Sequence, residues 1–141
     1  MNRRTLLSLL GLGTLAAPAM AQPKKSAAKQ RLVLQVSDND PAKWTLALSN
    51  ATNVQLELGK DNVQIEIVAY GPGLEMLKAE SKVADRLAGA LDDNVGLIAC
   101  ENTMTTTHVA KDDMYSGIAY VKAGVTHLMK RQREGWAYVR P

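Results

Sequence analysis

Apolar and polar positions alternate along this chain with two different periods from Arg31 onward. Short, nearly continuous apolar runs are typical of buried strands, whereas apolar residues that recur every three to four positions are typical of amphipathic helices. The apolar runs predict strands at residues 32–36, 63–69, 95–100, 118–121 and 136–139. The helical spacing predicts helices between them, at residues 41–58, 74–80, 84–91, 103–114 and 125–133.

The helix predicted at residues 41–58 has the clearest ends. Asp40 is a suitable N-cap residue, Pro41 fits the first helical position, and Gly59 ends the pattern. Its apolar stripe is predicted to face the core and consists of Trp44, Ala47, Leu48, Ala51, Val54 and Leu58. Because strands alternate with helices, we predict parallel pairing through right-handed crossovers and a three-layer α/β sandwich.

The N-terminus has the pattern of an export signal. Arg3 and Arg4 precede an apolar stretch at residues 6–17, and Ala19-Met20-Ala21 fits a small-residue cleavage site. The stretch is shorter than the roughly 20 residues that a membrane-spanning helix needs. We therefore predict that residues 1–21 are a removed signal peptide, that the protein is periplasmic, and that it is not membrane-bound afterwards. The arginine pair fits both the general secretory and the twin-arginine route.

Composition argues against a nucleic-acid partner. The 141 residues include 17 basic and 14 acidic ones, and loss of the signal's two arginines leaves a net charge of only +1. Residues 22–30 are polar and are predicted to form a flexible lead-in. Residues 31–141 suit one domain that buries a core without disulfides, because the chain has a single cysteine.

That cysteine, Cys100, is the main chemical candidate. It closes an apolar run and precedes Glu101-Asn102-Thr103, which predicts a thiol at a strand tip facing a helix N-terminus. A lone cysteine in an exported protein is either a small buried core residue or a reactive thiol with a function. The helix N-terminus would lower the pKa of the thiol, whereas Glu101 would raise it. Both interpretations stay open at this stage.

Three polar or glycine-rich loops follow the first three strands. In a parallel sheet such loops lie at one edge, where ligands normally bind. If these strands are neighbours, the loops form one crevice around Cys100, lined by Asp38, Asn39, Tyr70, Gly71, Gly73, Glu101 and Asn102. No glycine pattern matches a phosphate-binding loop.

A metal site is the alternative use of the same segment. Cys100, Met104 and His108 are spaced four apart, and on one helix face they would form a soft set for Cu(I) or Zn(II). Met114 and His127 would be additional ligands. The competing interpretation places Met104 in the core and leaves His108 exposed. His108 is also the candidate base for the thiol.

Four stretches of the chain resemble the DsrE/DsrF-like sulfur-relay family, in particular its exported, periplasmic branch. They are residues 35–44, 66–73, 99–104 and 135–141. The resemblance implies a three-layer α/β/α sandwich on a five-stranded, mainly parallel sheet, and assembly into trimers or hexamers. Leu46 and Leu56, which lie off the stripe of the first predicted helix, are candidate contacts between subunits.

In the cytoplasmic relay proteins, the cysteine of this loop carries sulfur as a persulfide and passes it to a partner thiol. The resemblance places that role on Cys100, with no cofactor and a thiol-bearing donor or acceptor protein as partner. A sulfur carrier is expected rather than a turnover enzyme. The alternative function is a non-enzymatic, oligomeric binding module for a small ligand or soft metal ion, in which Cys100 is structural.

Overall fold

The computed structural model describes residues 29–141, so the expected signal peptide at residues 1–21 lies outside the described residues. The strands are β1 (Gln30–Val36), β2 (Val63–Ala69), β3 (Gly96–Cys100), β4 (Ala119–Val121) and β5 (Ala137–Val139). The α-helices are α1 (Pro41–Leu58), α2 (Ala84–Asp92), α3 (Glu101–Thr106) and α4 (Gly124–Arg133). Short 3₁₀ helices are η1 (Lys60–Asn62), η2 (Gly71–Leu77) and η3 (Lys111–Asp113). No helix among these residues is long and apolar enough to cross a membrane.

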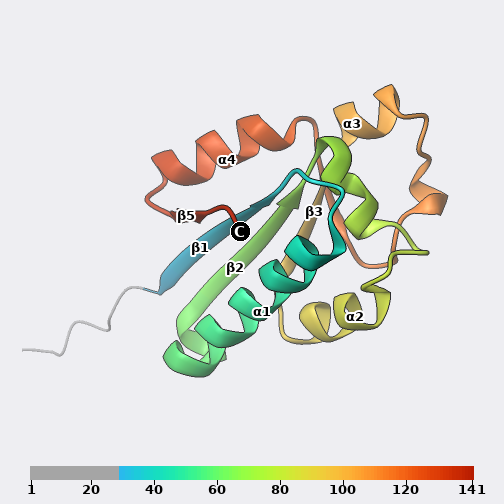
Figure 1. Cartoon of the computed structure of the whole chain (residues 1–141). Coiled ribbons are helices and arrows are strands. Elements are labelled where there is room, and N and C mark those ends of the chain that lie inside the picture. The colour runs from blue at the N-terminus through green and yellow to red at the C-terminus, as the bar shows by residue number, and fades with distance from the viewer. Residues whose placement is uncertain (1–28) are drawn as a thin grey trace, which may run out of the picture.

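The strands form one parallel sheet of five in the order β4-β3-β2-β1-β5. This confirms the predicted α/β fold, and each strand lies within two residues of its predicted bounds. Figure 1 shows α1 and α2 on one face of the sheet and α4 on the other, which makes three layers. The segment from β4 through α4 to β5 passes from one edge of the sheet to the opposite edge.

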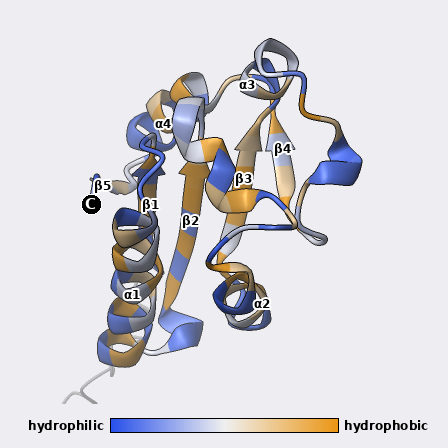
Figure 2. Cartoon of the chain, turned by 45° about the vertical axis from the view of Figure 1, so that its right-hand side comes forward, coloured by the Kyte–Doolittle hydropathy of each residue, from blue (hydrophilic) through white to orange (hydrophobic). Residues whose placement is uncertain are grey.

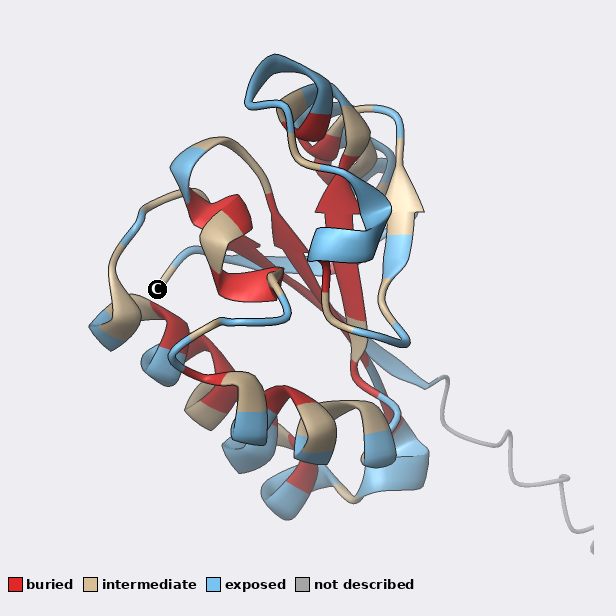
Figure 3. Ribbon diagram, turned by 90° about the vertical axis from the view of Figure 1, so that its right-hand side faces the viewer, coloured by how far each residue is buried: buried red, intermediate tan, exposed pale blue. Residues whose placement is uncertain are grey.

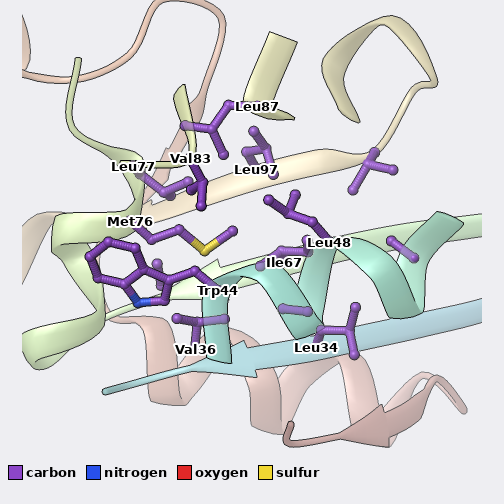
Figure 4. Close-up of a cluster of buried hydrophobic side chains, with 14 of the residues drawn as sticks. Leu34, Val36, Trp44, Leu48, Ile67, Met76, Leu77, Val83, Leu87 and Leu97 are labelled. Carbon is purple, nitrogen blue, oxygen red and sulfur yellow. The ribbon is translucent and has the colours of Figure 1, made fainter. Parts of the chain in front are cut away.

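The larger core cluster lies between the sheet and the helices α1, α2 and η2. Alternate residues of the strands face it, because successive side chains of a strand point to opposite faces. Figure 4 shows Trp44, Leu48 and Met76 packed over the strand residues Leu34, Ile67 and Leu97. Hydrophobic and buried residues are concentrated along the central strands of the sheet (Figures 2 and 3).

The opposite face carries a smaller cluster under α4, made of Val33, Val68, Ile98, Leu128 and Trp136. It also carries a buried carboxylate, because Glu66 of β2 alternates with Ile65 and Ile67 and so points toward α4. Arg131 contacts this carboxylate at 2.6 and 2.9 Å. Arg131, in the basic last turn of α4, is therefore paired with a buried carboxylate and is not only a solvated cap of the helix.

The predicted ends of α1 are confirmed. The Asp40 side chain accepts a hydrogen bond from the backbone N–H of Ala42 at 2.9 Å, and Gly59 follows the helix with φ of 88°. The apolar stripe predicted for α1 differs from the buried face at its end. Leu58, a predicted stripe residue, is 40% exposed, and Gln55 is buried instead. The Gln55 side chain donates to the carbonyl of Asp93 beyond the end of α2, at 2.8 Å, and this bond satisfies its buried amide.

The helix predicted at residues 103–114 is wrong in its extent. α3 ends at Thr106, and His108 follows with a positive φ of 56°. The hydroxyls of Thr105, Thr106 and Thr107 each donate to a backbone carbonyl four residues earlier, a bonding pattern that weakens helices. The helix predicted at residues 74–80 is instead the 3₁₀ segment η2.

Candidate functional site

The strand order brings the predicted loops to one edge of the sheet. Because β1, β2 and β3 are neighbours in register, Tyr70 and Cys100 extend beyond the paired residues Ala69 and Ala99 at the same level. Side-chain and backbone hydrogen bonds tie the loops together. The N–H of Gly71 donates to the Thr103 hydroxyl at 2.9 Å, and the N–H of Asn102 donates to the Lys122 carbonyl at 3.1 Å.

Cys100 is the last residue of β3 and the residue before α3, as predicted. Strand alternation points its side chain to the face covered by α4, the helix that begins at Gly124. The Sγ atom lies 4.0 Å from the carbonyl oxygen of Lys122, in the segment between β4 and α4. The sulfur therefore lies between the first turns of two helices, and the residue as a whole is 5% exposed.

These surroundings favour the thiolate form of Cys100. Burial raises the pKa of the thiol, but the Thr103 hydroxyl and the backbone N–H groups of Gly124, Thr103 and Asn102 lower it by more. The net effect is a pKa below the ordinary value for cysteine. Amide and hydroxyl donors stabilise an anion, so the sulfur is surrounded by groups suited to a nucleophile although little of the residue is exposed.

Thr103 is a site residue that sequence reasoning missed. Its hydroxyl oxygen accepts the hydrogen bond from Gly71, which leaves the hydroxyl hydrogen free to face the sulfur. The sequence contains one signal for this role. Thr103 is the third residue after Cys100, and the third residue of a helix lies close to the side chain of the residue that precedes the helix.

Gly124 is the second missed residue, and it has little space for a side chain. A Cβ at this position would lie 3.0 Å from the Cβ of Tyr70 and 3.1 Å from its ring. Tyr70, a predicted crevice residue, therefore packs directly against the first residue of α4. Nothing local marks Gly124 in the sequence, because its role depends on a helix that returns from the far edge of the sheet.

A cavity of about 370 Å³ opens between η2 and α3. It is lined by Gly71, Pro72, Leu74, Glu75, Asn102, Thr103, Thr106 and Thr107. Two of the predicted crevice residues, Gly71 and Asn102, belong to this lining, and Cys100 does not. Thr103 connects the cavity with the thiol, since it lines the cavity and its hydroxyl faces the sulfur of Cys100. The Glu75 carboxylate is paired with Lys78 at 2.6 Å.

The side chains of the loop after β1 do not face Cys100. Asp38 is bonded to Lys43 at 2.7 Å and contacts Arg140 at 3.5 Å, so its carboxylate faces the end of the chain. The hydrogen bond from Lys43 is the main cause of its lowered pKa. Asn39 is exposed. The expectation that Asp38 and Asn39 line the crevice with Cys100 is therefore not met by their side chains.

Two further crevice residues have structural contacts. Gly73 packs so closely on β1 that a Cβ there would lie 2.3 Å from the carbonyl oxygen of Val36. Glu101 begins α3 and contributes to the raised pKa of Tyr120, which is caused first by burial of that phenol.

The alternative soft-metal set is not assembled. Met104 is buried in the larger core cluster on the opposite face of the sheet from Cys100, and His108 is exposed beyond the end of α3. α3 is about 9 Å long at the usual rise per residue, so His108 lies at the helix end far from the sulfur. Among residues 29–141, no group of three His, Cys, Asp or Glu side chains is placed to hold a metal ion.

Two solved structures share this fold. No family model and no curated protein matches the sequence. The protein of unknown function MTH1491 from Methanobacterium thermoautotrophicum superposes with a TM-score of 0.77 at 34% identity, over 80% of this chain and 100% of that one. The conserved protein of unknown function BT1422 from Bacteroides thetaiotaomicron superposes with a TM-score of 0.60 at 14% identity, over 79% and 95% of the two chains. The second match supports the fold alone, but the identity and full coverage of the first mean that this protein belongs to the same family as MTH1491.

Proposed function

We propose that this protein is a periplasmic DsrE-like sulfur carrier that holds sulfane sulfur as a persulfide on Cys100. The observation that carries the proposal is the position of Cys100 at the end of β3, directly before α3, with its sulfur 4.0 Å from the Lys122 carbonyl in the segment that leads to α4. The Thr103 hydroxyl and nearby backbone N–H groups lower the pKa of its thiol. The likeness of residues 99–104 to the exported branch of the DsrE-like family and the five-stranded parallel fold support it further.

The chemistry needs only the thiolate and a donor persulfide. The Cys100 thiolate attacks the outer sulfur of a donor R–S–SH, forms a new S–S bond, and breaks the donor's own S–S bond. The electron pair of the broken bond leaves with R–S⁻, and the proton stays on the transferred sulfur. Release to an acceptor thiolate repeats this exchange in reverse, so no net oxidant or reductant is consumed.

The donors around Cys100 fit both steps. Amide and hydroxyl groups that stabilise the thiolate also stabilise it as the leaving group when sulfur passes on. The low exposure of the residue, 5%, shields a bound persulfide from other thiols and oxidants. The cavity beside Thr103 is the approach that we propose for the donor and acceptor groups.

Intact-mass measurement tests the proposal. The mature chain is incubated with a polysulfide or with thiosulfate, and a gain of one sulfur atom is expected that is lost on reduction. Cys100→Ser is the matched control and should gain nothing, because it removes the chain's only cysteine. If no donor adds sulfur to the folded wild-type protein, the carrier function is excluded.

A specific observation favours a second candidate, the binding module in which Cys100 is structural. The cavity of about 370 Å³ is lined by Thr103 and other residues of η2 and α3, and Cys100 is not among its lining residues. Alkylation separates the two functions. A carrier should react with iodoacetamide in the folded state, faster as pH rises through the pKa of the thiol, whereas a structural cysteine should react only after unfolding.

The location remains a proposal that rests on residues 1–21. Cell fractionation and N-terminal sequencing check it, since a periplasmic protein should begin near Gln22. A full-length N-terminus in the cytoplasmic fraction would contradict it.

A further inference from the structure

The cavity between η2 and α3 differs from an anion-binding site in the charge of its lining. Its volume of about 370 Å³ lies near the lower end of the range for small-molecule sites. Among its eight lining residues the only charged side chain is that of Glu75, and none is lysine, arginine or histidine. An anionic ligand would therefore lie near a carboxylate, with no cation in the lining to balance its charge.

The hydrogen-bond donors of the lining are largely used within the protein. The Thr106 hydroxyl donates to the Asn102 carbonyl at 2.9 Å, and the Thr107 hydroxyl donates to the Thr103 carbonyl at 2.7 Å. The N–H of Gly71 donates to the Thr103 hydroxyl at 2.9 Å, and the proline after it has no N–H. A hydroxyl that donates keeps its lone pairs, so these two threonines offer acceptors to a ligand.

The Glu75 carboxylate adds stronger acceptors to the same lining. It is paired with Lys78 at 2.6 Å, and the two side chains are 43% and 29% exposed, respectively. Ion pairs with this exposure contribute little, and Lys78 is not among the lining residues. Because a carboxylate accepts through two oxygens, Glu75 can bind a second cation from the side of the cavity.

An organic cation fits this lining better than a metal ion does. A hard metal ion needs several oxygen ligands, and among residues 29–141 no group of three His, Cys, Asp or Glu side chains is placed to hold one. An alkylammonium group needs only acceptors for its three N–H groups and an apolar surface for its carbon chain. Pro72, Leu74 and the methyl groups of the threonines supply that surface.

We propose that this cavity binds a small primary amine, whose ammonium group donates to the Glu75 carboxylate. The hydroxyl oxygens of Thr106 and Thr107 accept its other hydrogen bonds, and its carbon chain packs on Pro72 and Leu74. A free amine and the lysine side chain of a partner protein both present this chemistry, and the experiment distinguishes the two sources.

The experiment is an NMR titration of the ¹⁵N-labelled, folded protein in an amine-free buffer. Three ligands share an n-butyl group and differ in charge: n-butylamine, 1-butanol and valerate. Butylamine should bind with millimolar affinity, as expected for so small a ligand, and should shift the backbone signals of Gly71, Asn102 and Thr106. It should bind about threefold more tightly than 1-butanol, and valerate should leave these signals unchanged.

A fourth ligand, N-acetyl-lysine methylamide, separates the two sources of the ammonium group. Binding as tight as that of butylamine assigns the site to a lysine of a partner protein. Binding of butylamine alone assigns it to a free amine, because the blocked lysine carries a peptide backbone that the cavity then excludes.

Variants test the contact with Glu75. Glu75→Gln should weaken butylamine about threefold and leave 1-butanol unchanged, the effect expected of a partly exposed ion pair. Lys78→Met should tighten butylamine, because the carboxylate loses its competing cation. Glu57→Gln is the matched control, since this exposed residue of α1 lies outside the lining and its replacement removes the same charge. Thr106→Phe should fill the cavity and abolish the binding of both ligands.

The proposal is overturned if butylamine does not bind, if valerate binds as tightly, or if the amine shifts only signals outside the lining. Equal weakening by Glu75→Gln and Glu57→Gln would also overturn it, because the effect would then be one of net charge. The ligand series decides on the wild type alone, so a variant that fails to fold does not affect the result. Cys100 is not part of this site and no sulfur donor is used, so the outcome is independent of persulfide loading.

Discussion

At the scale of single residues, the acidity of Cys100 depends on a few donor atoms around one sulfur. Burial opposes the thiolate, and the Thr103 hydroxyl is the largest of the groups that favour it. Thr103→Val keeps the shape of the side chain and removes this donor. A hydrogen bond to a charged group contributes about 1.5–3 kcal/mol, so the variant should raise the pKa of the thiol by about one to two pH units.

The pH dependence of alkylation by iodoacetamide measures this change. Thr105→Val is the matched control, because its hydroxyl bonds only to the Glu101 carbonyl within α3 and does not line the cavity. Equal pH profiles for the two variants would contradict the role given to Thr103. Thr103→Val should also be less stable than the control, since the N–H of Gly71 loses its acceptor.

The sequence predicted part of this site. The place of Cys100 at a strand tip before a helix follows from local pattern, because the apolar run and the polar turn are adjacent in the chain. Gly124 and Lys122 were not predictable in the same way. They reach the sulfur because β4 pairs with β3 and α4 returns across the sheet, and no local signal specifies such a crossing.

At the scale of elements, two glycines in superficially similar helical segments have opposite requirements. Gly89 lies inside α2 with open space where a methyl group would lie, whereas a Cβ at Gly73 in η2 would lie 2.3 Å from the backbone oxygen of Val36. Gly89→Ala should stabilise the protein by about 0.5–1 kcal/mol, because glycine costs that much in a helix interior. Gly73→Ala should destabilise it by about 2–3 kcal/mol, because backbone must move.

Urea unfolding of the two variants and the wild type measures both effects. The wild-type midpoint should lie between the two variants, with the same slope for all three. A Gly73→Ala protein as stable as the wild type would mean that η2 is not held against β1 as described. A destabilised Gly89→Ala protein would contradict the open surroundings of that position.

Local signals also explain which elements were predicted well. α1 has a side-chain cap at one end and a glycine with positive φ at the other, and its bounds follow from these two residues. α3 was predicted too long, because its apolar spacing does not show that the threonine hydroxyls compete for the helix carbonyls. η2 is shaped by its contact with β1, which is a tertiary effect that local spacing does not contain.

At the scale of the whole molecule, the two faces of the sheet differ in what they leave exposed. On the face of α1, Leu56 is 75% and Leu46 is 48% exposed, whereas on the opposite face Val125 and Met129 of α4 are 54% and 48% exposed. Isolated exposed apolar residues are ordinary, so exposure alone does not identify an interface. A trimer or hexamer, which the resemblance to the family leads us to expect, would bury part of the exposed apolar surface.

The outer face of α1 is the interface that we test first, because Leu56 is the most exposed large apolar residue among residues 29–141. Light scattering of residues 22–141 should give three or six times the monomer mass, and Leu56→Arg should shift it toward the monomer, since an arginine in an apolar contact loses its hydration. Met129→Arg on α4 is the matched control and should remain associated. Dissociation by Met129→Arg alone would assign the interface to α4, and a monomeric wild type would exclude the assembly.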